Sequence, residues 1–288
     1  MSITGRGRRW SRFIEGSSGR ALIVPIDHGL TLGPVPGIDR PDDMADWLAD
    51  DLITGLVVHK GIAERLGSVG NAGVMIHLNG TMSLDAQPDR KVLLTRVDAA
   101  MRLGADGVSV QTNFCSENVG ENLRILGAVV DDAHEYGLPI MVMLYDKTGP
   151  QTGSEAMARM RHFVRAAVEL GVDAIKLGAP PDLSSIGELI DGVQAHTSVV
   201  FAGGDRKSDE QLLALARAAV EYGARGLCVG RNVFQHGDPR RMLQELRKAL
   251  GMPGPRAADG GCEGARGGAC RCVGSSNVTG CNHRHGSS

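Results

Sequence analysis

Short runs of apolar residues recur along the chain, and each run ends in glycine or in a polar residue. The runs are Ala21–Gly29, Gly55–Gly61, Gly73–Gly80, Gly107–Asn113, Ile140–Asp146, Asp173–Gly178, Ser198–Gly204 and Gly226–Arg231. Apolar residues follow one another here without alternating with polar ones. This pattern is typical of strands in a parallel sheet that is covered on both faces.

Most of the segments between these runs have the apolar spacing of helices. They are Pro88–Leu103, Glu117–Tyr136, Glu155–Leu170, Asp209–Tyr222 and Asp238–Leu250. Ser208 followed by Gln211 is a capping-box pattern, and Asp238 before Pro239 predicts a capped helix start. Glycine closes several of these segments before the next strand.

Eight strands alternating with helices predict a single (β/α)8 TIM barrel, and 288 residues are enough to build one. A doubly wound open sheet is the alternative, but no G-x-G-x-x-G motif opens the first helix. The expected organisation is an N-terminal lead-in over residues 1–20, the barrel over 21–250 and a tail over 251–288.

The tail changes in composition to Gly, Ala, Arg, Ser and Cys, and we expect it to be disordered. Its metal-ligating residue types are Cys262, Cys270, Cys272, Cys281, His283 and His285. Their spacing matches no standard zinc pattern, so disorder is the favoured interpretation. The other two cysteines, Cys115 and Cys228, are expected in the core.

A formal net charge of −2 without a basic stripe argues against nucleic acid and anionic membranes as partners. No apolar stretch is long enough to span a bilayer. The basic segment Met1–Arg12 is followed by no apolar h-region, so no secretory signal is expected. These features favour the cytoplasm.

Polar side chains gather where the predicted strands end, which is where barrels build active sites. Lys176, between Ile175 and Leu177, is the clearest candidate nucleophile. Burial should lower its pKa and expose a neutral amine that forms an imine with a ketone. The alternative is a solvated lysine at a strand end.

Tyr145 ends the preceding strand, where its phenol could move a proton to or from the substrate. Asp27, after the first strand, could act as a base or orient substrate hydroxyls. The ordinary alternatives are a packed tyrosine with a hydrogen-bonded hydroxyl and an aspartate in a turn.

The last two strands end in Gly203-Gly204 and in Gly230-Arg231, which fits a phosphate site after strands seven and eight. Arg231 would contribute a charged fork to the phosphate oxygens.

His28, His59 and His77 on adjacent strands could hold a metal. Lysine chemistry needs neither a metal nor a cofactor, so we expect none and assign these histidines to the pocket lining or to the core.

Eight short motifs stand in a fixed order between about Ala21 and Leu250. They are VPIDHGLTLGPVPG, VVHKG, IHLNG, GADGVSVQTN, GLPIMVMLY, AIKLG, AGG and GLCVGRNVFQH. Together and in this order, the motifs resemble the archaeal-type class I fructose-bisphosphate aldolases, particularly the branch of 2-amino-3,7-dideoxy-D-threo-hept-6-ulosonate synthases.

The resemblance implies that Lys176 forms the Schiff base, that Tyr145 donates a proton and that Asp27 accepts one. It implies sugar-phosphate contacts at Asp27, His28, Gly29, Leu30, Thr31, Tyr145, Asp146, Lys147, Gly203, Gly204, Gly230 and Arg231. It also implies a homo-oligomer, for which a decamer of two five-membered rings is one form.

The chain departs from the family pattern after the tyrosine, after the lysine and after the glycine pair. It has Asp146, Lys147 and Thr148 where the family usually has Pro-Arg-Gly. After the lysine it has Leu177, Gly178 and Ala179, where the family is expected to have a more polar run. After the glycine pair it has Asp205 and Arg206, where the family usually has Pro-Lys. Lys147 and Arg206 would provide cations for an amino-acid carboxylate.

These departures favour a similar secondary-metabolism branch, which joins dihydroxyacetone phosphate to aspartate 4-semialdehyde. The expected small-molecule partners are therefore a phosphorylated ketone and an aldehyde. The hept-6-ulosonate reaction, fructose-bisphosphate cleavage and a non-catalytic sugar-phosphate-binding barrel are the alternatives.

Overall fold

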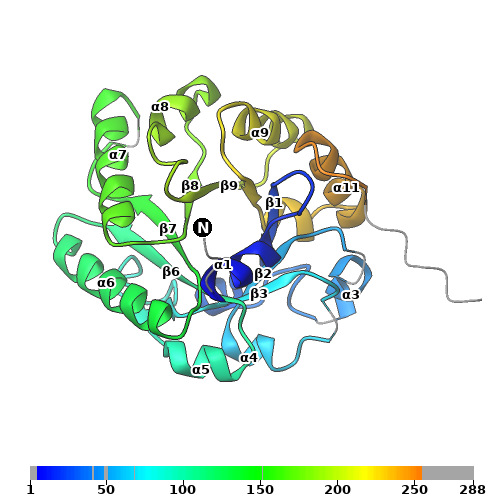
Figure 1. The fold of residues 1–288 in the computed structure, drawn as a ribbon, viewed down its shortest axis with the longest axis horizontal. Helices are drawn as coiled ribbons and strands as arrows, with labels where there is room; N and C mark the ends of the chain where they lie inside the picture. The colour runs from blue at the N-terminus through cyan, green and yellow to red at the C-terminus, as the bar shows by residue number, and fades with distance from the viewer. Residues whose placement is uncertain (1–4, 41, 49–50, 68, 151, 255–288) are drawn as a thin grey trace, which may run out of the picture. The chain divides into compact units, whose positions relative to one another are not determined.

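The computed structural model describes residues 5–40, 42–48, 51–67, 69–150 and 152–254. In this part of the chain, eight parallel strands close into a barrel in the order β1-β10-β9-β8-β7-β6-β3-β2, with helices around it (Figure 1). The strands are β1 (Ala21–Pro25), β2 (Gly55–Val58), β3 (Gly73–His77), β6 (Gly107–Phe114), β7 (Ile140–Asp146), β8 (Ala174–Gly178), β9 (Ser198–Ala202) and β10 (Gly226–Cys228). Each falls on one of the predicted apolar runs, so the predicted (β/α)8 barrel is confirmed.

The two helix starts that the sequence predicts as capped carry their side-chain caps, whereas several other helices begin without one. Their bounds are α1 (Gly5–Trp10), η1 (Ser11–Phe13), α2 (Gly29–Leu32), α3 (Asp42–Leu48), α4 (Lys60–Ala63), α5 (Val97–Arg102), α6 (Val119–Glu135), α7 (Ser154–Glu169), η2 (Leu183–Ser185), α8 (Ile186–Ile190), α9 (Asp209–Glu221), α10 (Arg231–Phe234) and α11 (Pro239–Ala249). The capping box of Ser208 and Gln211 is formed in both directions. Asp238 accepts from the backbone N–H of Arg241, with Pro239 at the first helical position.

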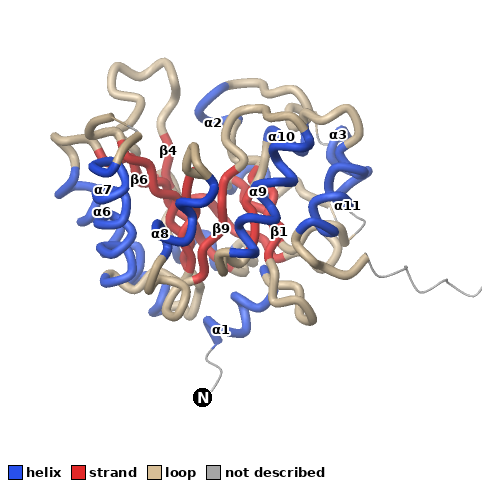
Figure 2. Tube along the Cα trace, turned by 90° about the horizontal axis from the view of Figure 1, so that it is seen from above, coloured by secondary structure: helices blue, strands red, loops and turns tan. Residues whose placement is uncertain are grey.

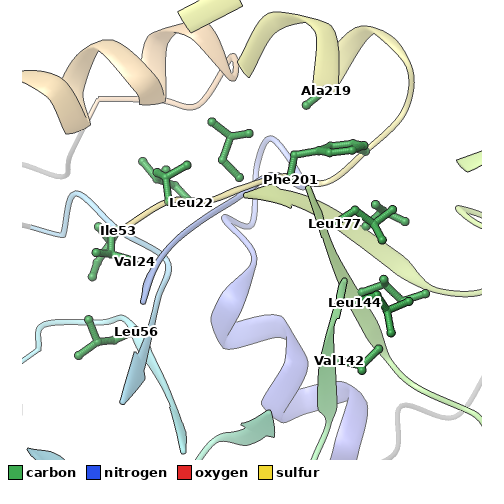
Figure 3. Packing of buried hydrophobic residues seen from close by; sticks show 14 of the residues in the cluster. Leu22, Val24, Ile53, Leu56, Val142, Leu144, Leu177, Phe201 and Ala219 are labelled. Carbon is green, nitrogen blue, oxygen red and sulfur yellow. The ribbon is translucent and has the colours of Figure 1, made fainter. Parts of the chain in front are cut away.

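Strand side chains alternate between two apolar layers. The outer layer packs against the helices and includes Leu144, Leu177 and Phe201. Figure 3 shows Leu144 and Leu177 on neighbouring strands and Phe201 near Ala219 of α9. The inner layer fills the barrel and includes Met75 and Met141. Because the interior is filled in this way, polar side chains at the strand ends lie above an apolar floor.

The N-terminal segment closes one end of the barrel, and Figure 2 shows α1 at the end opposite α2 and β4 (Asn79–Gly80). Phe13 is fully buried there. A Cβ at Gly55 would lie 2.5 Å from the Phe13 ring, and a Cβ at Gly73 would lie 2.9 Å from it. These strands therefore begin with glycine because the ring of Phe13 occupies the space of a side chain.

One predicted helix is shorter than expected. Within Pro88–Leu103, the residues before Val97 form an extended segment that includes β5 (Val92–Leu93), which pairs antiparallel with β4. The backbone N–H groups of Leu94 and Thr95 also donate to the Leu78 carbonyl. Pairing with the end of β3 outweighs the helical spacing here, and α5 supplies the remaining turns.

The ordered barrel continues slightly past the predicted boundary at Leu250. Met252 is buried, and the Pro253 carbonyl accepts two hydrogen bonds from the Arg247 guanidinium at 3.1 and 2.7 Å. The rest of the predicted disordered tail, with its cysteines and histidines, lies outside the described residues. No described helix is long and apolar enough to cross a membrane.

Candidate active site

Lys176 lies inside the barrel near the end of β8, with only 7% of its surface exposed. Its Nζ lies 3.7 Å from the Sδ of Met143, its register partner on β7, and it also hydrogen bonds with the Cys228 thiol of β10. A lysine at this position could have extended to solvent. Instead, the amine is held among side chains from several strands.

The electrostatic surroundings of Lys176 reverse the expectation from burial. Burial alone would lower the pKa of the ammonium, but Cys228, Tyr145 and Asp27 outweigh it and raise the pKa above its ordinary value. Burial also raises the pKa of the Cys228 thiol to about 11. Asp27, whose own pKa is lowered, brings a full negative charge to the amine, and the predicted lowering of the lysine pKa is wrong. The amine must therefore lose a proton before it can attack a ketone.

Asp27 follows β1 and lies near His28, the next residue in the chain, and near His77 at the end of β3. Its carboxylate oxygens lie 3.7 Å from His28 Nδ1 and 3.8 Å from His77 Nε2. Burial alone would raise the pKa of Asp27, but its electrostatic interactions with His77, His28 and Lys176 lower it. Asp27 is therefore ionised at neutral pH and able to accept a proton.

The three histidines form the wall beside Asp27. Burial lowers the pKa of all three, that of His77 to about 4. His77 Nδ1 lies 2.7 Å from Ser109 Oγ, and the His59 and His77 rings meet edge to face with centroids 5.3 Å apart. Among the described residues, no group of three or more His, Cys, Asp or Glu side chains is arranged to hold a metal ion. The contacts of His77 with Ser109, Asp27 and His59 fit the pocket-lining interpretation of the histidines.

The ends of β9 and β10 form the corner where phosphate was predicted. Gly204 has φ +71°, and a Cβ at Gly203 would lie 2.7 Å from Asn232 Nδ2. A Cβ at Gly230 would lie 2.7 Å from His28 Cε1, so this glycine also allows close packing of the histidine. Arg231 is one-third exposed and forms a 2.9 Å ion pair with the exposed Asp205. The ends of β9 and β10 thus bring glycine backbone and the Arg231 guanidinium to the same corner of the barrel.

Residues 21–236 match the family model of the DeoC/LacD family aldolases. The chain belongs to this family. The aldolase is 34% identical over 246 residues to 2-amino-3,7-dideoxy-D-threo-hept-6-ulosonate synthase 1 of Archaeoglobus fulgidus, covering 85% of this chain and 90% of that protein. It is 31% identical over 267 residues to 2-amino-4,5-dihydroxy-6-oxo-7-(phosphonooxy)heptanoate synthase of Streptomyces griseus, covering 92% of this chain and 97% of the relative.

A solved archaeal fructose-1,6-bisphosphate aldolase has the same fold, with a TM-score of 0.74 and 27% identity over 84% of this chain and 98% of the other. In that structure the catalytic lysine is covalently bound to the carbinolamine intermediate of the substrate. The family and these relatives identify the chain as an enzyme, a class I aldolase that uses Schiff-base chemistry.

Some predicted contact residues of the aldolase already have structural partners. The buried Asp146 carboxylate accepts from Arg159 at 2.9 Å and from the Thr148 hydroxyl at 2.6 Å. It therefore fixes the start of the loop after β7. Leu30 and Thr31 lie in the single turn of α2, where Leu30 contacts Gly80 and the Thr31 carbonyl accepts from Ser83. Gly29 and Lys147 are exposed and open to a ligand.

Sequence reasoning assigned Cys228 to the core and gave Met143 no role, yet both lie against the lysine amine. It also gave no role to Lys91 and Asp89, which lie on the segment between β4 and β5. The inward positions of Cys228 and Met143 follow from strand alternation once the barrel register is known. The segment between β4 and β5 has no such periodicity, so only the structure places it at the site.

Proposed function

We propose that this aldolase joins dihydroxyacetone phosphate to aspartate 4-semialdehyde through a Schiff base on Lys176. The observation that supports it best is the buried Lys176 amine, held within electrostatic reach of Tyr145 and Asp27. The Gly203-Gly204 backbone and Arg231 lie at the neighbouring strand ends and would bind the donor phosphate.

The reaction begins when Asp27 accepts a proton from the Lys176 ammonium. The free amine attacks the ketone carbon, and Tyr145 gives a proton to the departing hydroxyl, so water leaves and an iminium forms. The iminium draws electrons from the neighbouring carbon, whose proton passes to the Tyr145 phenolate to give an enamine. That carbon attacks the aldehyde carbon, and Tyr145 returns the proton to the aldehyde oxygen. Water then adds to the new iminium and gives one proton to the Tyr145 phenolate, product is released, and Asp27 returns its proton to the amine.

The Streptomyces griseus relative supports this choice of acceptor, because its printed name describes an amino-hydroxy-oxo-phosphonooxyheptanoate, and because the match covers 92% of this chain. The Archaeoglobus relative, at slightly higher identity, favours hept-6-ulosonate synthesis as the second candidate. Both candidate reactions proceed through a Schiff base on the lysine. They differ in the substrates that react at the site.

A panel assay tests whether dihydroxyacetone phosphate and aspartate 4-semialdehyde are the substrates. The purified enzyme is incubated with dihydroxyacetone phosphate and, separately, with aspartate 4-semialdehyde, glyceraldehyde 3-phosphate or no aldehyde, and products are identified by mass. We expect the seven-carbon phosphorylated amino acid only with aspartate 4-semialdehyde. Faster formation of fructose bisphosphate, or turnover with none of the aldehydes, would contradict the proposed substrate.

We also infer a homo-oligomer. Exposed apolar side chains lie on the segment around β5, among them Leu84, Val92 and Leu93, and such a patch is typical of a contact surface. Light scattering on the purified protein measures the assembly, and a monomer at working concentration would contradict the inference. The cytoplasmic location expected from the sequence stays a prediction.

A further inference from the structure

Lys91 is a buried lysine for which the Schiff-base mechanism has no use. Its residue is 7% exposed, and its Nζ donates to the Pro88 carbonyl at 2.9 Å. An ammonium has three donors and is costly to bury without anionic partners. Asp89, two residues earlier, offsets part of this charge, and an ammonium held beside the reacting groups can also bind a ligand with negative charge.

The structure holds Lys91 beside the reacting groups. Asp89, two residues earlier, accepts from Asn113 Nδ2 at 2.9 Å. Asn113 is the register partner of Tyr145 across β6 and β7. Lys91 lies within electrostatic reach of Asp89 and Lys147, and it also acts on His77 in the wall beside Asp27.

This cluster lies on the side of the barrel opposite the phosphate corner. In the strand order β10-β9-β8-β7-β6-β3, the glycine corner is on β10 and β9, Lys176 on β8 and Tyr145 on β7. Lys147 follows β7, Asn113 ends β6, and the segment that carries Lys91 follows β3. A donor with its phosphate at the corner and its imine on Lys176 would direct its growing carbon chain toward this cluster.

There is room beside Lys147. A cavity of about 620 Å³ opens between α7 and α8, and Tyr145 and Lys147 are among its lining residues, whereas Lys91 and Asp89 are not. An acceptor that extends past Tyr145 would therefore meet Lys147 without displacing any element of the fold.

We propose that Lys91, Lys147 and Asp89 form the subsite for the acceptor, which is an aldehyde that carries an α-amino acid group. The two ammonium groups would bind its carboxylate, and the Asp89 carboxylate would bind its ammonium. This proposal rests on the proposed function and adds the residues that choose its acceptor. Arg206, which the sequence suggested for the carboxylate, follows β9 on the phosphate side of the barrel.

The test compares acceptors that differ only in charge. Dihydroxyacetone phosphate is paired with succinic semialdehyde or with its methyl ester, which lacks the carboxylate. A hydrogen bond to a charged group is worth about 1.5–3 kcal/mol, so Lys91→Met should raise the KM for succinic semialdehyde about ten- to a hundredfold. The KM for the ester and the borohydride trapping of the donor should change less than about twofold.

Lys60→Met is the matched control, because Lys60 also donates to a carbonyl of the same segment, that of Leu94 at 2.9 Å, but is exposed. It should leave both KM values unchanged. If Lys91→Met folds poorly, Lys147→Met tests the subsite at an exposed position and should show the same selective loss. Asp89→Asn should weaken the binding of aspartate 4-semialdehyde more than that of succinic semialdehyde, because only aspartate 4-semialdehyde carries an ammonium group.

Equal effects of Lys91→Met or Lys147→Met on acid and ester, or no effect on either, would overturn the subsite. If Asp89→Asn weakens the binding of both charged acceptors equally, Asp89 does not belong to the subsite. Failure of the unaltered enzyme to trap the donor on Lys176 would overturn the proposed function and the subsite with it. Failure of the proposed function can be told apart from failure of the subsite, because trapping of the donor requires no acceptor.

Discussion

At the residue scale, the chemistry of Lys176 depends on neighbours that no local sequence pattern reveals. The apolar flanks of Lys176 predicted its strand and its burial, and both are observed. The direction of its pKa was predicted wrongly because Tyr145, Asp27 and Cys228 reach it from other strands. The apolar neighbours of a residue in the sequence indicate whether the residue is buried. The direction of its pKa shift depends instead on the charged groups that the fold brings near it.

The pH dependence of imine formation tests this electrostatic arrangement. Asp27 raises the pKa of Lys176, so the neutral amine becomes abundant only at higher pH. Removing the charge with Asp27→Asn should lower the lysine pKa and move the midpoint of the trapping-rate profile to lower pH, while the maximal rate falls because a proton acceptor is lost. Initial rates of borohydride trapping across pH measure both effects.

Asp132→Asn, on the exposed face of α6, is the control and should leave the profile in place. A midpoint that moves to higher pH in Asp27→Asn would show that Asp27 does not stabilise the ammonium.

At the element scale, the strands were predictable because each is an unbroken apolar run, and the capped helices because Ser208 and Asp238 satisfy free backbone N–H groups. The structure of the segment between β4 and β5 was not predictable. Its apolar residues have the spacing of a helix, but they are exposed and do not form one. The lead-in over residues 1–20 was predicted without a structural role. The glycines that begin β2, β3 and β6 were the one available indication that a ring fills the barrel floor.

The role of Phe13 as the floor of the barrel is testable by truncation of its ring. Phe13→Ala should lower the free energy of unfolding by about 3–5 kcal/mol, the usual cost of removing a fully buried aromatic ring. Denaturant unfolding followed by circular dichroism measures the change. Arg8→Ala, on the exposed face of α1, is the control. A loss below about 1 kcal/mol would mean that the segment covers the barrel without filling it.

At the scale of the whole molecule, the compact unit ends a few residues later than composition suggested. Met252 and the Pro253 carbonyl complete the packing around Arg247, although Gly251–Gly254 resembles the tail in composition. Whether these last residues pack depends on partners elsewhere in the chain. The same Arg247 guanidinium also donates to the carbonyls of Asp51 and Leu52. Composition can indicate a tail, but it does not fix where the tail begins.

Two truncations separate the packed residues from the tail. A chain that ends at Gly254 should match the full chain in melting temperature and activity. A chain that ends at Leu250 should lose stability, because Arg247 would then lose the Pro253 carbonyl and Met252 would leave its buried position. Thermal unfolding measures the difference, and equal melting temperatures for both truncations would show that residues 251–254 contribute nothing.

The central claim of this account is that Lys176 carries the substrate covalently. The most direct measurement is borohydride reduction of the enzyme in the presence of dihydroxyacetone phosphate, followed by peptide mapping by mass spectrometry. We predict one reduced adduct, on Lys176, which is absent from Lys176→Met and present at normal yield in Lys60→Met. An adduct on another lysine, or none under conditions in which the enzyme turns over, would contradict the account.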